Sequence, residues 1–184
     1  MMRRKNNKER LAIQIGITLT AGMFSIVPTA FGAPTGGQVA AGGANISDPL
    51  NITSTTTNNV ITWQDFSVGK NETVRFDGGA KTNNYLNIVT GANTSNIQGK
   101  IQGGNDVYLV NPNGIIIGKD AVVDVGNFYA STRYVSEEAA KRAADSKNLA
   151  AVLGDTSNSV AADVVNLGTV QADQVVSSSA MIAL

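Results

Sequence analysis

Three aspartates are the side chains whose type and spacing could carry out chemistry: Asp106, Asp120 and Asp124. Paired carboxylates can hydrolyse a glycosidic bond, and carboxylates together with backbone carbonyls can bind calcium. However, Asp106 falls in an expected turn, Asp120 begins an expected strand, and Asp124 is an isolated polar residue in the segment AVVDVG. No loop has the spacing of an EF-hand. We therefore interpret all three as solvent-facing acids and predict no catalytic residue and no metal site.

The composition excludes other kinds of catalytic site. The chain has 184 residues with no His and no Cys, which excludes thiol chemistry, disulfides and Ser-His or Cys-His couples. The Gly-rich stretches 42–43 and 103–104 lack the GK[ST] continuation of a phosphate-binding loop. Trp63 lies in a strand pattern, where core packing is expected rather than ligand stacking. The sequence thus predicts a protein that is not an enzyme and holds no cofactor.

The first 32 residues have the pattern of a secretory signal peptide. Residues 1–10 carry five cations and one anion, and residues 11–27 carry no charge. Small residues follow, so we predict cleavage between Gly32 and Ala33. The alternative is an uncleaved membrane anchor, although an apolar run of 17 residues is at the short limit for a span. We expect no stable membrane span after processing.

Removal of this segment changes the charge balance. The whole chain has 14 Lys+Arg and 14 Asp+Glu, and loss of five cations and one anion leaves 9 and 13, a formal charge of −4 on residues 33–184. An acidic chain lacks the electrostatic footprint of a nucleic-acid-binding protein, so no nucleic acid partner is expected. An exported chain without cysteine is typical of a bacterial exoprotein.

Short strands are expected through most of the processed chain. Residues 33–58 read as a flexible lead-in with weak or exposed strands. Between residues 59 and 132, runs of about four to six apolar or alternating residues are separated by turns rich in Gly and Asn. A weak repeat relates residues 96–102 to residues 166–171, with one insertion, which suggests stacked units of similar shape. These features favour a parallel β-helix, and a β-sandwich remains the alternative because alternation alone does not distinguish the two.

One segment has a helical composition. Residues 136–153 are rich in Ala, Glu, Lys and Leu and predict one or two short surface helices. Ser136 is placed to cap the first turn, where Glu137 and Glu138 favour the helix dipole, and Gly154 is placed to end the helix. The pair at 141–142, Lys-Arg, is expected on a solvated face. Strand patterns resume at residue 160.

The sharpest local motif is the tetrapeptide Asn-Pro-Asn-Gly at residues 111–114. Proline presets the second position of a β-turn, while Asn and Gly suit the third and fourth. The turn joins the apolar runs VYLV and IIIG, so it is expected at a tight corner between two buried strands. Turn chemistry by itself requires no further role.

The ordered combination of these segments resembles a known family. The stretches NVITWQDFSVGKNETVRF and NIVTGANTSNIQGKIQGGNDVYLVNPNGIIIGKDAVVDVGNFYAST are similar to the N-terminal secretion domain of filamentous-haemagglutinin-like exoproteins, the passengers of bacterial two-partner secretion. The similarity is closest over residues 59–132 and looser to residue 184. It implies a right-handed, single-stranded parallel β-helix with N-terminal capping strands, here at 33–58, and a secretion domain at 59–184 with a helical insertion at about 136–153.

The resemblance also implies a role and partners. Such domains enter the periplasm through the general secretion machinery and are bound there by the periplasmic domains of a cognate outer-membrane transporter, which exports them to the cell surface or the medium. The motif residues carried over as relevant to secretion are Asn111, Pro112, Asn113, Gly114 and Ile115. The second family tetrapeptide, Asn-Pro-Asn-Leu, is not present, because residues 93–96 depart from it.

Two other functions stay open from the sequence. The first is an adhesin-type module that binds surfaces through the flank of the β-helix, and the second is a β-helix enzyme acting on polysaccharides. Family members usually continue far beyond this domain. Because the chain stops in a strand pattern without a cap, we expect a C-terminal truncation.

Overall fold

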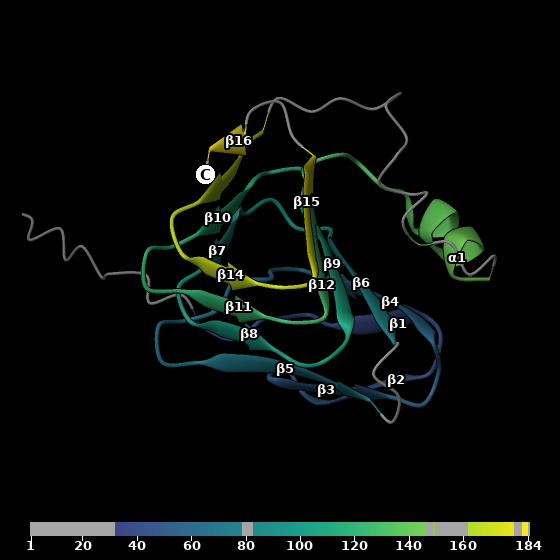
Figure 1. Cartoon of the computed structure of the whole chain (residues 1–184). Helices are drawn as coiled ribbons and strands as arrows, with labels where there is room; N and C mark the ends of the chain where they lie inside the picture. The colour runs from purple at the N-terminus through teal and green to yellow at the C-terminus, as the bar shows by residue number, and fades with distance from the viewer. Residues whose placement is uncertain (1–31, 79–82, 146–148, 150–161, 179–181, 184) are drawn as a thin grey trace, which may run out of the picture.

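The computed structural model describes residues 32–78, 83–145, 149, 162–178 and 182–183, which wind into a parallel β-helix (Figure 1). Sheet 1 contains the longer strands: β1 (Gln38–Ala41), β4 (Asn58–Trp63), β6 (Asn84–Val89), β9 (Asp106–Val110), β12 (Asn127–Ser131) and β15 (Gln174–Ser178). Sheet 2 contains β7 (Ser95–Ile97), β10 (Ile115–Ile117), β13 (Val164–Asn166) and β16 (Ile182–Ala183). Sheet 3 contains β2 (Ala44–Asp48), β3 (Asn51–Ser54), β5 (Thr73–Gly78), β8 (Lys100–Gln102), β11 (Val122–Asp124) and β14 (Thr169–Gln171).

Each complete coil contributes one strand to each sheet and stacks in register on the coil before it. Tyr85 in β6 pairs with Val107 in β9, and Ser95 in β7 pairs with Ile115 in β10. All pairings between the described strands are parallel except β1 with β4 and β2 with β3, which lie antiparallel at the N-terminal end. The prediction of a parallel β-helix is therefore confirmed, and a β-sandwich is excluded because its strands pair antiparallel.

The interior of the coils is filled by rows of side chains that repeat from one coil to the next. In sheet 1, Tyr85, Val107 and Phe128 occupy one row and are all buried. Trp63 is 1% exposed and packs edge-on against Phe66 at a centroid distance of 5.4 Å, which confirms the expected core position. Such rows exclude water over the whole length of the solenoid, so burial of aliphatic and aromatic area holds the coils together.

The predicted repeat is half right. Ile101, Val123 and Val170 stack in sheet 3, and Gly99 and Gly168 occupy similar tight corners before β8 and β14. A Cβ on Gly99 would lie 2.1 Å from the carbonyl oxygen of Gly69, so the corner requires glycine. The first half of the alignment is wrong by one residue, because Asn96 and Val165 both pair with Ile116. The expected insertion is therefore not present: Ile97 and Asn166 both pair with Ile117, Lys100 and Thr169 both pair with Val122, and two residues form the corner in each coil.

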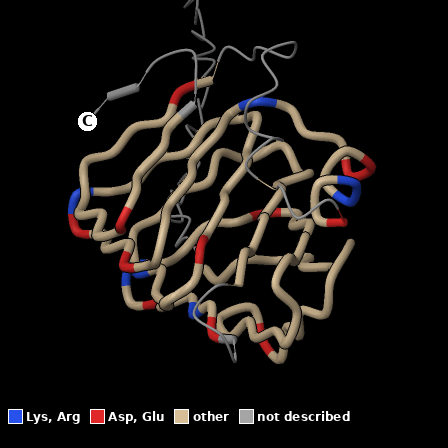
Figure 2. The backbone as a smooth tube through the Cα atoms, turned by 45° about the vertical axis from the view of Figure 1, so that its right-hand side comes forward, with Lys and Arg blue, Asp and Glu red and all other residues tan. Residues whose placement is uncertain are grey.

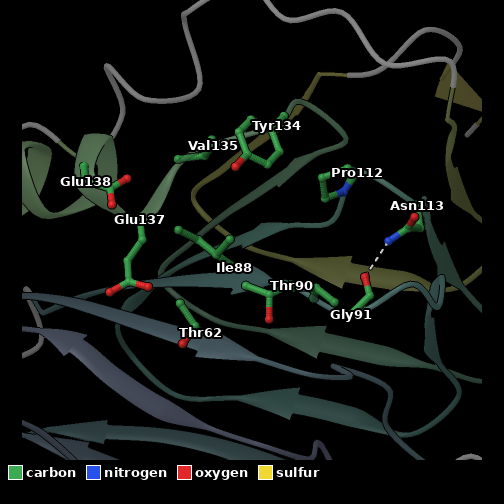
Figure 3. Close-up of a pocket in the computed structure, with 11 residues that line it drawn as sticks. Thr62, Ile88, Thr90, Gly91, Pro112, Asn113, Tyr134, Val135, Glu137 and Glu138 are labelled. Carbon is green, nitrogen blue, oxygen red and sulfur yellow. Dashed lines mark hydrogen bonds between the residues drawn. The ribbon is translucent and has the colours of Figure 1, made fainter.

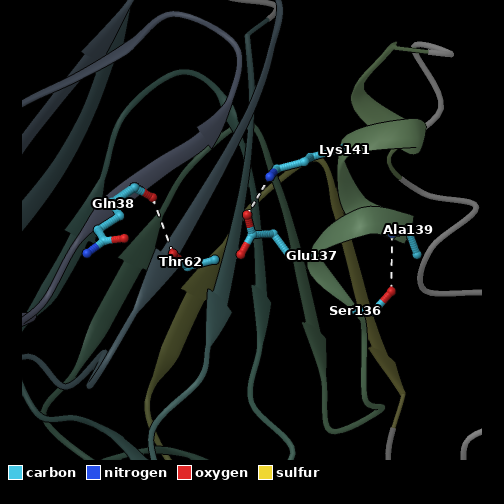
Figure 4. Close-up of polar contacts among 6 residues, drawn as sticks. All are labelled: Gln38, Thr62, Ser136, Glu137, Ala139 and Lys141. Carbon is cyan, nitrogen blue, oxygen red and sulfur yellow. Dashed lines mark hydrogen bonds and ion pairs between the residues drawn. The ribbon is translucent and has the colours of Figure 1, made fainter.

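Helix α1 (Glu137–Asp145) packs on the outer face of sheet 1 (Figure 1). Ser136 caps it, since its Oγ accepts a hydrogen bond from the backbone NH of Ala139 at 3.2 Å (Figure 4). Glu137 and Lys141 form an ion pair at 2.5 Å along the helix, and this hydrogen bond raises the pKa of Lys141. The end of the insertion, with the predicted stop at Gly154, lies outside the described residues.

The outer face of sheet 1 is apolar where the helix covers it. A second core cluster joins Leu86, Ile88, Tyr108 and Val110 to the helix through Ala140, Ala143 and Ala144. Tyr108 stacks on Tyr129 with a centroid distance of 4.3 Å and an interplanar angle of 4°. Sheet 1 is thus buried on both faces, which explains the near-continuous apolar runs of β6 and β9.

From this outer cluster we predict that the folded protein loses stability at alkaline pH. Burial raises the pKa of Tyr108 above its ordinary value of 10.0, with a smaller contribution from Tyr129. Above pH 10 the phenol of the unfolded chain ionises while that of the folded chain stays neutral, so the free energy of unfolding falls as the pH rises. We expect urea midpoints measured from about pH 8 to pH 11 to fall less steeply for Tyr108→Phe. The matched control is the exposed Tyr134→Phe, which should retain the original slope; equal slopes for both variants would contradict the prediction.

The predicted signal peptide falls largely outside the described residues, which begin at Gly32. From Thr35 onward the chain is tied to the β-helix, because Thr35 and Asp65 form an antiparallel bridge. In the part of the chain that the structure describes, no helix has the length and apolar character needed to cross a membrane.

Candidate functional site

The Asn-Pro-Asn-Gly corner follows β9 and turns the chain from sheet 1 into β10 of sheet 2. Its turn is closed by a hydrogen bond from the backbone NH of Gly114 to the carbonyl oxygen of Asn111, 3.1 Å long. Gly114 has φ 106°, in the left-handed region that favours glycine. The predicted tight corner between two buried strands is confirmed.

Asn111 is fully buried and uses its whole side-chain amide. Its Nδ2 donates to the carbonyl oxygen of Asn93 and to the Oγ of Ser95, each at 2.9 Å. Its Oδ1 accepts from the backbone NH of Asn113 at 2.9 Å and from the Asn113 Nδ2 at 3.1 Å. Because only an amide has both donors and acceptors in this arrangement, Asn111 determines the shape of the corner.

Asn113 ties the exposed tip of the corner to the preceding coil. Its Nδ2 donates to the carbonyl oxygen of Gly91 at 2.8 Å (Figure 3). Its own carbonyl oxygen accepts a hydrogen bond from the Thr94 hydroxyl at 2.7 Å. Asn113 is exposed and Pro112 is half-buried, whereas Gly114 and Ile115 are buried. The part of the motif that another molecule can reach is therefore Pro112 and Asn113.

The corner is also joined to the following coil. The backbone NH of Asn111 donates to the carbonyl oxygen of Ser131 at 2.9 Å, and that of Ile115 donates to the carbonyl oxygen of Asp163 at 3.0 Å. Ile115 pairs with Ser95 on one side and Val164 on the other. The motif therefore links three successive coils through hydrogen bonds.

A pocket of about 480 Å³ opens beside the exposed tip of the motif (Figure 3). It is lined by residues from successive coils and from the start of α1: Thr62, Ile88, Val89, Thr90, Gly91, Pro112, Asn113, Tyr134, Val135, Glu137 and Glu138. The sequence did not point to this pocket, because its walls come from distant segments. Tyr134 is the clearest omission: it is 59% exposed and no motif marks it.

The three aspartates do not form a catalytic group. Asp106 accepts a hydrogen bond from the Asn127 Nδ2 at 2.7 Å, and Asp120 is an exposed partner of Lys70 at 3.7 Å. Asp124 is exposed on β11, between Gln102 and Gln171 of the neighbouring strands. Charged residues are sparse along the stacked strands and recur on α1 (Figure 2). Within the described ranges, no three acidic side chains lie close enough together to hold a metal ion.

Comparison with known proteins gives the same picture as the fold. Residues 29–182 match the model of the TPS secretion domain, where TPS denotes two-partner secretion. The heme/hemopexin-binding protein of Haemophilus influenzae strain Rd is 36% identical over 120 residues, which are 64% of this chain and 13% of that protein. A second Haemophilus influenzae protein of the same name is 38% identical over 73 residues, 40% of this chain and 8% of that protein.

A solved structure supports the assignment. The crystal structure of the HMW1 secretion domain from Haemophilus influenzae superposes with a TM-score of 0.61 at 27% identity, over 79% of this chain and 42% of that one. This chain thus spans 13% and 8% of the two curated relatives and less than half of the solved domain. Since the family match extends over most of the chain and the fold agrees with it, the chain belongs to the TPS secretion domain family of two-partner secretion exoproteins.

Proposed function

We propose that residues 1–32 direct the chain into the general secretion machinery and are removed between Gly32 and Ala33. The remaining chain is recognised in the periplasm by a cognate outer-membrane transporter and exported to the cell surface or the medium. The observation that carries this proposal is the family match over residues 29–182, since such domains work with an outer-membrane transporter. The exposure of Gly32, with open space around it, supports access for a peptidase.

The accessible tip of the motif supports a direct part in recognition. Pro112 and Asn113 reach the surface, while Asn111, Gly114 and Ile115 are buried and hold them in place. We assign recognition of the transporter to Pro112 and Asn113. The other three motif residues hold these two in position. The protein works in this scheme by being bound and carried, without catalysis.

The test is co-expression of the full chain with the outer-membrane transporter of its own organism in a Gram-negative host. We expect extracellular protein that begins at Ala33 when the transporter is present, and retention in the periplasm when it is absent. Asn113→Ala should lower the extracellular amount, whereas the matched control Asn71→Ala, an exposed turn asparagine elsewhere, should not. Equal export with and without the transporter would refute the proposal.

A second candidate function is surface binding by the longer protein. The curated relatives are named as heme/hemopexin-binding proteins, and this chain corresponds to only 13% of one of them. Binding of the purified chain to cells or glycans, without any transporter, would favour an adhesin-type role for this domain itself.

A further inference from the structure

We infer that the pocket beside the Asn-Pro-Asn-Gly corner binds a neutral sugar unit of a surface glycan once the chain has folded. The inference goes beyond the secretion function and does not rest on it. It gives the second candidate function, surface binding, a site and a class of ligand. Thr62 and Tyr134 are brought to one pocket only by the stacking of the coils between them, so the ligand is one that the chain meets after folding.

The pocket has the size and the construction of a small-molecule site. Its volume of about 480 Å³ lies within the range of such sites, about 300–1,000 Å³. Its walls come from successive passes of the chain: Thr62 on β4, Ile88 on β6, Pro112 after β9, Tyr134 after β12 and Glu137 at the start of α1 (Figure 3). Because these segments belong to the stacked coils and to a helix packed on them, the pocket is already formed before a ligand arrives.

The floor of the pocket suits the C–H face of a sugar ring. Ile88, Val89 and Val135 are buried lining residues, and Pro112 adds a rigid apolar edge. Tyr134 is 59% exposed and carries an aromatic ring into the lining (Figure 3). A sugar ring has an apolar face of C–H groups, and aliphatic and aromatic side chains can remove that face from water.

The edges of the pocket carry free hydrogen-bond acceptors. Glu137 uses one carboxylate oxygen for its ion pair with Lys141, and Figures 3 and 4 both show its carboxylate directed toward Thr62. The Oδ1 of Asn113 accepts no hydrogen bond from another described residue, since the bonds of this side chain are donated by its Nδ2. Sugar hydroxyls can donate to such oxygens, and the hydroxyl of Tyr134 can donate or accept in return.

The charge of the lining favours neutral sugars over acidic ones. The described residues that line the pocket include two carboxylates, Glu137 and Glu138, and no Lys or Arg. A sialylated or sulfated sugar would place its anion close to these carboxylates without a cation to pair with it. A neutral sugar supplies hydroxyl donors to the same carboxylates and has no charge to desolvate.

The experiment measures binding of the folded, processed chain to an array of neutral oligosaccharides and their sialylated forms, followed by calorimetric titration of the neutral glycan that is retained best. We expect the sialylated form of that glycan to bind at least about tenfold more weakly. Tyr134→Ala removes the ring, and Glu137→Gln replaces a charged acceptor with a neutral amide. Each variant should weaken binding of the neutral glycan about tenfold.

The ion pair on α1 provides the matched control. Lys141→Gln breaks the same pair as Glu137→Gln, but Lys141 does not line the pocket, so this variant should bind normally. Leu167→Ala removes a comparably exposed apolar side chain on another coil, 62% exposed against 59% for Tyr134, and should also bind normally. If Tyr134→Ala or Glu137→Gln loses its native circular dichroism, the other variant decides the test.

Four results would overturn the inference. If the unaltered chain binds no neutral glycan, the pocket is not a sugar site, whereas the secretion proposal stands because export is measured separately. If Tyr134→Ala and Glu137→Gln bind as well as the unaltered chain, the glycan binds elsewhere on the molecule. If Lys141→Gln weakens binding as much as Glu137→Gln, the ion pair of α1 rather than the pocket is responsible. Tighter binding of the sialylated forms would contradict the assignment to neutral sugars.

Discussion

Replacing Asn111 with alanine lowers the free energy of unfolding by about 3 kcal/mol. The side chain is fully buried and connects Asn93 and Ser95 of the preceding coil to Asn113 of its own turn. Truncation leaves the buried hydroxyl of Ser95 without its donor, which costs about 1–3 kcal/mol, and also removes the hydrogen bond to the carbonyl oxygen of the exposed Asn93. Because the turn also loses the acceptor for the NH of Asn113, its tip is released.

The measurement is equilibrium unfolding in urea, followed by the fluorescence of the single tryptophan, Trp63. The matched control is Asn113→Ala, which removes an exposed amide of the same turn and should cost about 1 kcal/mol. If Asn111→Ala costs no more than Asn113→Ala, the buried amide does not organise the corner. Loss of export in both variants, with the larger loss of stability in the first, would separate the structural asparagine from the recognition asparagine.

Replacing Trp63 with alanine is expected to cost about 3–5 kcal/mol. The indole is 1% exposed, contacts Phe66 edge-on, and donates from its Nε1 to the Oδ1 of Asn87 at 3.0 Å. Asn87 is itself fully buried, and its Nδ2 donates to the carbonyl oxygens of Tyr85 and Tyr108, each at 3.2 Å. Trp63 therefore fills the interior of an early coil and completes the hydrogen bonding of a polar group inside it.

Trp63→Phe isolates the polar part of this effect. It keeps an aromatic ring but leaves the Oδ1 of Asn87 without a donor, at an expected cost of about 1–3 kcal/mol beyond the lost volume. In a double-mutant cycle, Asn87→Ala should cost less in the Trp63→Phe background than in the unaltered chain. Additive costs would contradict a coupling between the two side chains. Circular dichroism in urea is the readout, with the exposed Leu167→Ala as a control expected to change stability by less than about 0.5 kcal/mol.

Polar residues inside the solenoid explain why the sequence predicted its core only in part. Tyr85, Val107 and Phe128 stand at alternating positions of strand-like runs, so their burial follows from the pattern. Asn87 interrupts the apolar run of β6 and reads as a surface position, yet it lies inside because strand alternation places it on the same side as Tyr85. A buried amide is tolerated where neighbouring coils supply its partners, and those partners come from other strands.

Helix α1 shows a second limit of what the sequence can predict. Its composition and its cap at Ser136 were evident from the residues, and both are observed. The surface that the helix covers was not predictable. The apolar residues Leu86, Ile88 and Tyr108 could equally have faced the interior of the β-helix, since a strand buried on both faces has an almost continuous apolar sequence. For the same reason the pocket between α1 and the Asn-Pro-Asn-Gly corner could not be inferred, because its lining residues come from several coils and from the start of the helix.

The sequence by itself determined the local chemistry of this protein: the short strands, the glycine corners, the Asn-Pro-Asn-Gly turn, the helix cap and the resemblance that names the family. These features depend on backbone preferences and on spacings within a few residues. Only the tertiary structure decided which side of each strand faces inward, why Asn111 is structural while Asn113 is accessible, and which distant residues line the pocket beside the motif. The reason is that stacking brings together residues separated by one coil or more, and a linear pattern does not contain the register of that stacking.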